Sequence, residues 1–209
     1  MSVLSSSRIV DLIKERKLYV SPLLSEKQIG PVSIDLRLGN VALIVRARGL
    51  SHVDPRHYQQ SLEQTEHQGE RERRQKLERH EIPFHRQLLL HPGTLTLVPT
   101  LEWVKLPYNL KGVVTARSSW AREGLNIATA TFINPGYNGI ITLELANFGQ
   151  IPIAIYPGMR IAQIAFYQVD FPDGSEEPAS PKSQFDLSFE PHSGEITKHD
   201  GPFIPPENS

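Results

Sequence analysis

Short apolar runs separated by tight turns constrain the fold of this chain more than any other feature. Runs that alternate apolar and polar residues, or that are rich in Val, Ile and Leu, recur about every ten residues. The runs are VSIDLRLGNVALIV, RQLLLHPGTLTLVPTLEWVKLP, NLKGVVTAR, FINPGYNGIITLELANFG and IPIAIYPGMRIAQIAFYQV. Turn dipeptides such as Gly39-Asn40 and Pro92-Gly93 punctuate them, and the pattern around Pro157-Gly158 predicts a hairpin. Many short strands of this kind predict an all-β sandwich, jelly roll or barrel.

The N-terminal stretch SSSRIVDLIKERKLYV predicts one helix instead. Ser5 to Ser7 offer N-cap side chains, and the helix is expected to end before Ser21-Pro22. The residues that would share one face are Ile9, Leu12, Ile13 and Arg16.

Two further segments depart from the strand pattern. Residues 51–86 are polar and mix both charges, which predicts a solvated helical insertion with ion pairs one turn apart. Its histidines invite a metal site, but their spacing matches no ligand template. These histidines are His52, His57, His67, His80 and His85. We expect a β domain over residues 1–170 that contains this insertion, followed by a Pro- and Ser-rich C-terminal segment, 171–209, that forms either a loosely packed arm or a flexible lid over an active site.

Composition excludes several classes of function. The 209 residues carry a net charge of −1, so no global positive field favours nucleic acid. The chain has no cysteine, which excludes disulfides, thiolate zinc sites and a cysteine nucleophile. The N-terminus lacks a signal-peptide pattern and no apolar run is long enough to span a bilayer. We expect a soluble, cytoplasmic protein without membrane partners.

The stretch TARSSWAREG is the strongest candidate for binding an anion. It follows the predicted strand GVVTA and opens a short helical stretch, where free backbone N–H groups favour anions. Arg117 and Arg122 could add forked hydrogen bonds to phosphate oxygens. In the alternative interpretation Ser118 only caps the helix while the two arginines pair with surface acids. The local pattern leaves both interpretations open.

Two neighbouring motifs could supply the rest of a site. In GIITLELANFG, strand alternation puts Thr142 and Glu144 on the face opposite Leu143. A glutamate among apolar and small residues has a raised pKa and suits proton transfer, whereas the alternative is an exposed strand glutamate. In ATATFINPGYNG, small residues and a tight turn would let a base approach the main chain of residues 128–131, although an ordinary hairpin has the same pattern.

In combination, these motifs resemble a known family. The ordered segments SIDLRLG, ARSSWAREG, TATFINPGYNG, ITLELANFG and YPGMRIAQIAF are similar to those of the dCTP deaminase branch of the dUTPase-like superfamily, from about residue 5 to about residue 169. The resemblance implies a distorted β jelly roll that forms a homotrimer with active sites between subunits. It also implies metal-independent hydrolysis of dCTP to dUTP and ammonia, with Mg²⁺ bound only through the triphosphate and no zinc.

The resemblance also implies roles for individual residues. Glu144 matches the catalytic glutamate, which takes a proton from the water that attacks C4 of cytosine and passes it to the leaving amino group. Ser118 matches the serine that holds this water, and Arg122 the arginine that orients the site and stabilises developing charge. The remaining positions that would bind substrate are Arg117 and Ser119 at the phosphates, Thr129 and Ala130 at the base, Asn134 at the sugar, and Tyr137 and Thr142 beside them.

The sequence departs from the family pattern in three places. Asn134 stands where the family has an aspartate that serves the hydrolytic water in dUTP-cleaving members, and asparagine cannot act as a base. A histidine that often precedes the Thr-Ala pair is missing, and the tail motif SQFDLS lacks the usual Lys-Tyr pair, with Lys182 two residues upstream of Gln184. These departures keep two alternatives open: a dUTPase-like pyrophosphatase or deaminase of a modified deoxycytidine nucleotide, and a non-catalytic nucleotide-binding trimer.

Overall fold

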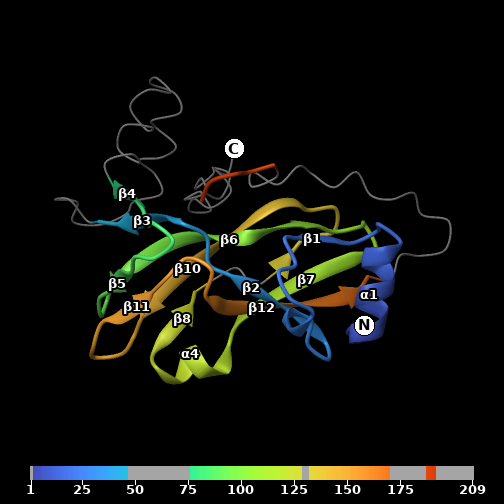
Figure 1. Cartoon of the computed structure of the whole chain (residues 1–209), viewed down its shortest axis with the longest axis horizontal. Coiled ribbons are helices and arrows are strands. Elements are labelled where there is room, and N and C mark those ends of the chain that lie inside the picture. Colours follow the sequence, from blue (N-terminus) through green and yellow to red (C-terminus); the bar gives the residue numbers. More distant parts are fainter. Residues whose placement is uncertain (1, 47–75, 129–131, 170–186, 192–209) are drawn as a thin grey trace, which may run out of the picture.

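The described part of the chain is mainly β, and its paired strands are antiparallel (Figure 1). The computed structural model describes residues 2–46, 76–128, 132–169 and 187–191. Its helical elements are α1 (Ser6–Lys14), η1 (Glu26–Gln28) and α4 (Ser118–Arg122). Its strands are β1 (Tyr19–Ser21), β2 (Ser33–Arg37), β3 (Val41–Val45), β4 (Leu77–Glu81), β5 (Leu88–Leu90), β6 (Leu95–Lys105), β7 (Leu110–Ala116), β8 (Leu125–Ile127), β9 (Phe132–Ile133), β10 (Asn138–Asn147), β11 (Ile153–Ile155) and β12 (Arg160–Gln168).

The described strands form three sheets. The largest has the order β4-β3-β6-β10-β8, with β1 also paired to β6. The second has the order β2-β12-β7-β9, and β11 pairs with β5 in a third, two-stranded sheet. The all-β prediction is therefore confirmed. None of the helices in the described part of the chain is long and apolar enough to cross a bilayer.

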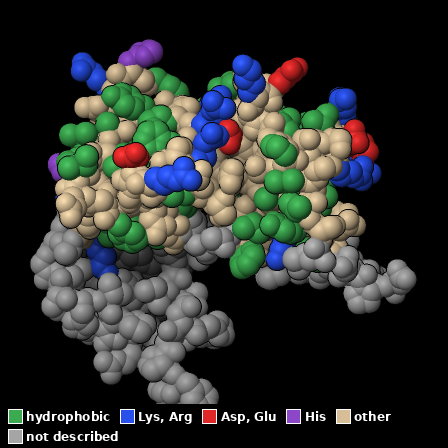
Figure 2. Space-filling view, turned by 90° about the horizontal axis from the view of Figure 1, so that it is seen from below, with side chains coloured by type: hydrophobic (Ala, Val, Ile, Leu, Met, Phe, Trp, Pro, Cys, Tyr) green, Lys and Arg blue, Asp and Glu red, His purple; other side chains and the backbone are tan. Residues whose placement is uncertain are grey.

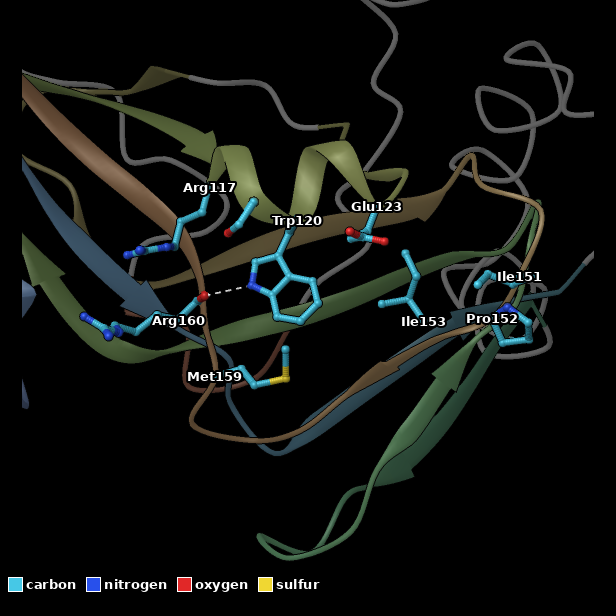
Figure 3. A pocket seen from close by; sticks show the side chains of 9 residues that line it. Arg117, Trp120, Glu123, Ile151, Pro152, Ile153, Met159 and Arg160 are labelled. Atoms are coloured by element: carbon cyan, nitrogen blue, oxygen red, sulfur yellow. Dashed lines mark hydrogen bonds between the residues drawn. The ribbon is translucent and has the colours of Figure 1, made fainter.

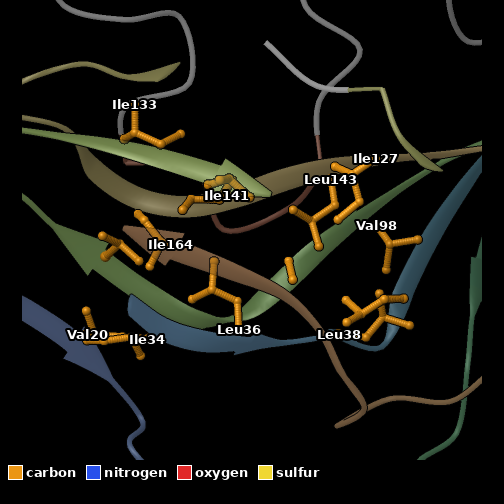
Figure 4. Packing of buried hydrophobic residues seen from close by; sticks show 14 of the residues in the cluster. Val20, Ile34, Leu36, Leu38, Val98, Ile127, Ile133, Ile141, Leu143 and Ile164 are labelled. Atoms are coloured by element: carbon orange, nitrogen blue, oxygen red, sulfur yellow. The ribbon is translucent and has the colours of Figure 1, made fainter. Parts of the chain in front are cut away.

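The core forms where the inward faces of the two larger sheets meet (Figure 4). On β2, Ile34 and Leu36 are fully buried while their neighbours are partly exposed, as the alternating sequence predicts. Leu143 of β10 and Ile164 of β12 are fully buried in the same cluster. Burial of each such side chain contributes about 1.5–3 kcal/mol to the stability of the fold. The core therefore determines which face of each strand points inward and which face carries polar groups.

The N-terminal helix is shorter than the sequence pattern predicts. Ser5 is its N-cap, and its hydroxyl accepts a hydrogen bond from the N–H of Arg8. The helix ends at Lys14, and Arg16 has a φ of 58°, outside helical geometry. The residues that follow form β1, because their backbone pairs with the end of β6. The prediction that the helix extends to just before Ser21 is wrong, because residues 19–21 pair with β6 as a strand instead.

The described end of the charged insertion, from residue 76 onward, contains a strand. Residues 77–81 form β4, which pairs antiparallel with β3 from Val41 to Val45. The prediction of a helix is therefore wrong for residues 77–81, where pairing with β3 overrides the local charge pattern because a short isolated helix is only marginally stable in water. Residues 51–75 of the predicted insertion lie outside the described residues, and so do His52, His57 and His67.

The predicted hairpin around Pro157-Gly158 is also wrong. The turn exists, with a φ of 84° at Gly158, but β11 pairs with β5 while β12 lies between β2 and β7. The two strands on either side of the turn thus belong to different sheets. The turn therefore carries the chain from the two-stranded sheet to the sheet that contains β12.

Candidate functional site

The motif TARSSWAREG forms a connection between β7 and β8. β7 ends at Ala116, and α4 follows with Arg117 as its N-cap residue. The carbonyl of Arg117 accepts hydrogen bonds from the N–H groups of Trp120 and Ala121, at 3.0 and 3.1 Å. The side chain at the N-cap position makes no capping bond, and Ser118 is exposed. The interpretation in which Ser118 caps the helix is therefore wrong.

Gly124 ends this helix in a conformation that suits only glycine. Its φ is +89°, and a Cβ placed there would lie 2.6 Å from the backbone nitrogen of Gly149. The N–H of Phe148 donates to the carbonyl of Gly124 at 2.8 Å. The connection is thereby fixed against the loop after β10, so that α4 lies at one end of the β10–β8 pair (Figure 1).

Arg117 forms an ion pair with Asp35 of β2. One terminal nitrogen of its guanidinium donates to Asp35 Oδ2, and the Nη1 of Arg160 lies 3.3 Å from the same oxygen. The Asp35 side chain is only 13% exposed, against 33% and 44% for the side chains of Arg117 and Arg160. Arg117 thus pairs with an acid, as the alternative interpretation expected, but this acid is mostly buried and not a surface acid. Asp35 and Arg160 were not predicted as site residues.

A cavity of about 630 Å³ opens beside this ion pair (Figure 3). Its polar rim carries Arg117, Ser119, Glu123 and Arg160. Its apolar wall is made by Trp120, Ile151, Pro152, Ile153 and Met159. The indole N–H of Trp120 donates to the carbonyl of Arg160 at 3.1 Å. This hydrogen bond holds the indole ring beside the polar side chains of the cavity. Two guanidinium groups and a serine beside an apolar wall suit a ligand that has both anionic and aromatic parts.

This cavity lies on the side of the molecule that carries α4. Figure 2 shows that side from below, with Lys and Arg side chains gathered close to acidic ones between hydrophobic areas. A surface on which basic groups adjoin apolar ones can bind an anionic ligand without a large net charge on the chain.

Glu144 lies on β10, as predicted, with its carboxyl withdrawn from water. Burial raises the pKa of Glu144, and its Oε2 is buried without a hydrogen-bond partner among the described residues. The flanking Leu143 and Leu145 are fully buried on the opposite face, which confirms the predicted alternation. A carboxylate with a raised pKa and an oxygen free of protein partners is suited to accept a proton from water.

The chain that precedes β9 meets β10 at this glutamate. The N–H of Ala128 donates to the carbonyl of Glu144 at 2.8 Å. Thr129 and Ala130, predicted to read the base, come directly after Ala128 and lie outside the described residues. Thr142 is half-buried two positions before Glu144 on the same face of β10.

The motif INPGYNG forms the predicted turn between β9 and β10. The N–H of Tyr137 donates to the carbonyl of Asn134 at 3.2 Å, and Gly136 has a φ of 78°. Asn134 is exposed, whereas Tyr137 is buried and its hydroxyl donates to the carbonyl of Ile140. Tyr137 is thus a core residue, and its predicted contact with substrate stays a prediction.

The predicted residues fall into separate places on the chain. Arg117 and Ser119 line the cavity, while Ser118 and Arg122 are exposed on α4 and are not among its lining residues. Glu144 does not line this cavity either. The group suited to proton transfer, Glu144, therefore lies on β10. The groups suited to anion binding lie in a separate cavity next to α4.

Glu102 is a buried acid that the sequence analysis missed. It is fully buried on β6, and burial raises its pKa. Its carboxylate accepts hydrogen bonds from the side-chain amide of Gln28 and from the N–H of Arg37, both at 2.8 Å. The same amide of Gln28 donates to the carbonyl of Asp35 at 2.9 Å. The rule that singled out Glu144, an acid between apolar strand residues, also applies to Glu102 and could have found it.

The histidines that are described do not form a metal site. The Nε2 of His80 lies 2.8 Å from Glu78 Oε1. Within the described ranges no group of three or more His, Cys, Asp or Glu side chains converges.

A short segment of the C-terminal tail is docked on the large sheet. The N–H of Leu187 donates to the carbonyl of Asn138 at 2.7 Å, and the N–H of Ile140 donates to the carbonyl of Ser188 at 3.3 Å. The ring of Phe189 lies 4.8 Å from that of Trp103 between centroids. The tail thus passes over the start of β10, which follows the turn at Asn134.

Comparison with known proteins covers most of the chain. The profile of the dCTP deaminase-like family matches residues 3–169. A curated "dCTP deaminase, dUMP-forming" from Dictyoglomus turgidum is 40% identical over 173 residues, which cover 81% of this chain and 82% of that protein. The protein of the same name from Methanobrevibacter smithii is 33% identical over 82% of this chain and 83% of its own.

One solved structure is similar over a comparable part of the chain. The 2'-deoxycytidine 5'-triphosphate deaminase from Agrobacterium tumefaciens superposes with a TM-score of 0.57 at 25% identity over 78% of this chain. The superposition spans 47% of that longer protein, about half its length.

Proposed function

This chain belongs to the dCTP deaminase-like family, and from that premise we propose that it catalyses the hydrolytic deamination of dCTP. In this reaction water adds to C4 of the cytosine ring and the C4 amino group leaves as ammonia. The observation that carries the proposal is the Glu144 carboxyl, which burial leaves with a raised pKa and with one oxygen free of protein partners among the described residues.

Glu144 has two proton transfers to perform. Its carboxylate takes a proton from the attacking water, so that hydroxide character develops as the bond to C4 forms. The protonated carboxyl then gives this proton to the amino nitrogen as the C4–N bond breaks. A raised pKa suits both steps, because the group binds the proton firmly enough to accept it from water and still releases it to an amine.

The substrate-binding side chains lie around α4. We assign Arg117 and Ser119 to the phosphates because both line the cavity beside the indole of Trp120. Ser118 and Arg122 are assigned to the water and to charge that develops on the ring, and the main chain at Thr129 and Ala130 to the base edge. Because Glu144 and this cavity are separate on one chain, the proposal includes a homotrimer in which subunits share each site.

Magnesium enters this proposal as part of the substrate. Phosphate oxygens are ligands that Mg²⁺ prefers, so the triphosphate would hold the ion. It would neutralise phosphate charge while Arg117 contacts the remaining oxygens.

The product needs separate consideration. The family resemblance implies dUTP as the product, whereas the curated relatives are named dUMP-forming. Their names favour a second reaction, in which water attacks dUTP and releases pyrophosphate to leave dUMP. Asn134 is exposed at the turn before β10 and cannot serve as the base for that water. We therefore propose dUMP formation as the second candidate activity, with its base supplied by a group other than Asn134.

One product analysis tests both activities. Purified protein is incubated with magnesium and dCTP, with dUTP and dCMP in parallel, and products are separated by anion exchange while ammonia is measured. Ammonia with dUTP supports deamination alone, and ammonia with dUMP and pyrophosphate supports both steps. Glu144→Gln should abolish ammonia release yet still bind dCTP. Tight dCTP binding without any ammonia from the unaltered protein would instead favour a non-catalytic nucleotide-binding trimer.

A further inference from the structure

We propose that Asp35 positions two arginines for phosphate binding, so that Arg160 contacts the substrate phosphates together with Arg117. The inference rests on the proposed function, because it concerns the triphosphate end of the same site. It adds one phosphate-binding residue and one positioning residue to that site.

The geometry brings the two guanidinium groups to one carboxylate oxygen. Arg117 and Arg160 both donate from a terminal nitrogen to Oδ2 of Asp35, and Arg160 does so at 3.3 Å. A guanidinium carries five N–H donors, so each keeps most of its donors for a ligand. Both arginines also line the cavity beside Ser119, and in Figure 3 their side chains extend to the same side of Trp120. Arg160 is therefore placed to contact an anion that Arg117 and Ser119 bind.

The main chain that carries Asp35 is held by strand pairing and by a buried side chain. β2 pairs with β12, which puts Asp35 opposite Gln163 and close to the start of the strand that carries Arg160. The carbonyl of Asp35 accepts a hydrogen bond from Gln28, whose amide also donates to the buried carboxylate of Glu102. A buried polar network that is fully bonded restricts motion more than separate surface contacts do. The hydrogen bonds that join Glu102, Gln28 and the carbonyl of Asp35 thus hold the main chain of Asp35. The side chain of Asp35 contacts the two arginines.

Without the carboxylate of Asp35, the guanidinium groups of Arg117 and Arg160 would move apart. Adjacent guanidinium groups repel one another, and long arginine side chains lose conformational entropy when they are fixed. A shared carboxylate offsets both effects before the substrate arrives, which is preorganisation for binding. One unit of positive charge remains on the three groups, and it can attract a phosphate.

A role in positioning and a role as a simple counter-charge predict opposite results. If Asp35 acted only through its charge, neutralising it would make the site more positive and strengthen anion binding. If Asp35 positions the arginines, neutralising it weakens anion binding despite the more positive site.

The test uses the full-length protein with dCTP as substrate and inorganic tripolyphosphate as a competing ligand. The variants are Arg160→Gln, Arg160→Lys and Asp35→Asn. The matched control is Arg46→Gln, because Arg46 is an exposed arginine that pairs with Glu78 at 3.1 Å and lies outside the cavity. For Arg160→Gln we expect KM for dCTP and the tripolyphosphate inhibition constant to rise about tenfold, as loss of a charge-assisted hydrogen bond predicts, with kcat little changed.

For Arg160→Lys, KM and the inhibition constant should lie between those of Arg160→Gln and of the unaltered protein. Lysine keeps the positive charge but cannot form the two parallel hydrogen bonds of a guanidinium. Asp35→Asn should raise both constants, and Arg46→Gln should leave them unchanged. The inference is overturned if Arg160→Gln matches the Arg46→Gln control, or if Asp35→Asn binds tripolyphosphate more tightly. If Asp35→Asn does not fold, the two Arg160 variants still decide whether Arg160 contacts phosphate. If the unaltered protein releases no ammonia, the proposed function fails, and calorimetric binding of tripolyphosphate to the same variants still tests the arginine pair.

Discussion

At the residue scale, the fully buried Glu102 and the half-buried Glu144 differ in how their carboxyl groups are bonded. Burial raises the pKa of both Glu102 and Glu144. The carboxylate of Glu102 is bonded by Gln28 and by the N–H of Arg37, so its lone pairs are used within the fold. Glu144 keeps a buried oxygen without a partner among the described residues, and a buried group left in that state costs stability unless a ligand or water completes it. The difference supports the proposal that Glu144, rather than Glu102, is the catalytic acid.

The raised pKa of Glu144 predicts the acid limb of the activity profile. Glu144 must be ionised to accept a proton, so kcat/KM should fall as pH decreases through its raised pKa. Measurement of ammonia release between about pH 4 and pH 8 should therefore place this limb above the ordinary glutamate pKa of about 4.3. A profile that stays flat across that ordinary value would contradict the assignment.

The same pKa predicts a gain in stability when Glu144 is neutralised. A carboxyl with a folded-state pKa above its unfolded value contributes stability in acid, and this contribution is lost as pH rises through the folded-state pKa. Glu144→Gln should therefore melt at a higher temperature than the unaltered protein at neutral pH, and the difference should shrink below the unfolded pKa. Thermal melts at several pH values measure it. A lower melting temperature for the variant at neutral pH would show that Glu144 has a stabilising partner.

At the scale of elements, local patterns predicted strands well and strand partners poorly. The alternation in ITLELAN predicted which face of β10 holds Glu144, because side-chain direction depends only on position along a strand. The hairpin at Pro157-Gly158 was not found, since pairing depends on segments far away in sequence. Asp35 and Arg160 escaped prediction for the same reason: Asp35 pairs with residues 82 and 125 positions away.

The end of α4 offers a test of this local packing. Gly124→Ala would place a Cβ 2.6 Å from the nitrogen of Gly149 in a backbone with a φ of +89°. We expect a loss of about 2–4 kcal/mol in the free energy of unfolding, from backbone strain and the forced contact together. The matched control is Gly93→Ala, where φ is +73° but nothing lies within 4 Å of the added carbon. Urea denaturation should give a loss of only about 1 kcal/mol there. Equal losses at the two sites would show that the contact with Gly149 relaxes.

At the scale of the whole molecule, exposed apolar side chains support the proposal that subunits associate. Phe148 and Ile151 are each 71% exposed, and Ile151 belongs to the apolar wall of the cavity. Exposed apolar residues that gather at a functional surface are typical of an interface. The separate positions of this cavity and of Glu144 agree with sites completed by another subunit.

Light scattering tests the proposed trimer directly. We expect a mass of about three times the 23.5 kDa chain at working concentration, because shared sites need assembled subunits. Introducing a charge at the exposed position Ile151 should lower both the mass and the activity. A fully active monomer would contradict the shared-site arrangement.

The burial of β10 has a consequence for the kinds of mutation that its gene can tolerate. The strand is paired on both sides, with β6 and β8, and its residues alternate between the core and the face that bears Glu144. Deleting a single codon between Asn138 and Glu144 would shift every later residue to the opposite face. Leu145 would then take the position of the carboxylate, and Glu144 would point into the hydrocarbon interior. Descendants of this gene can vary β10 by substitution, while in-frame changes of length are confined to the loops at its ends.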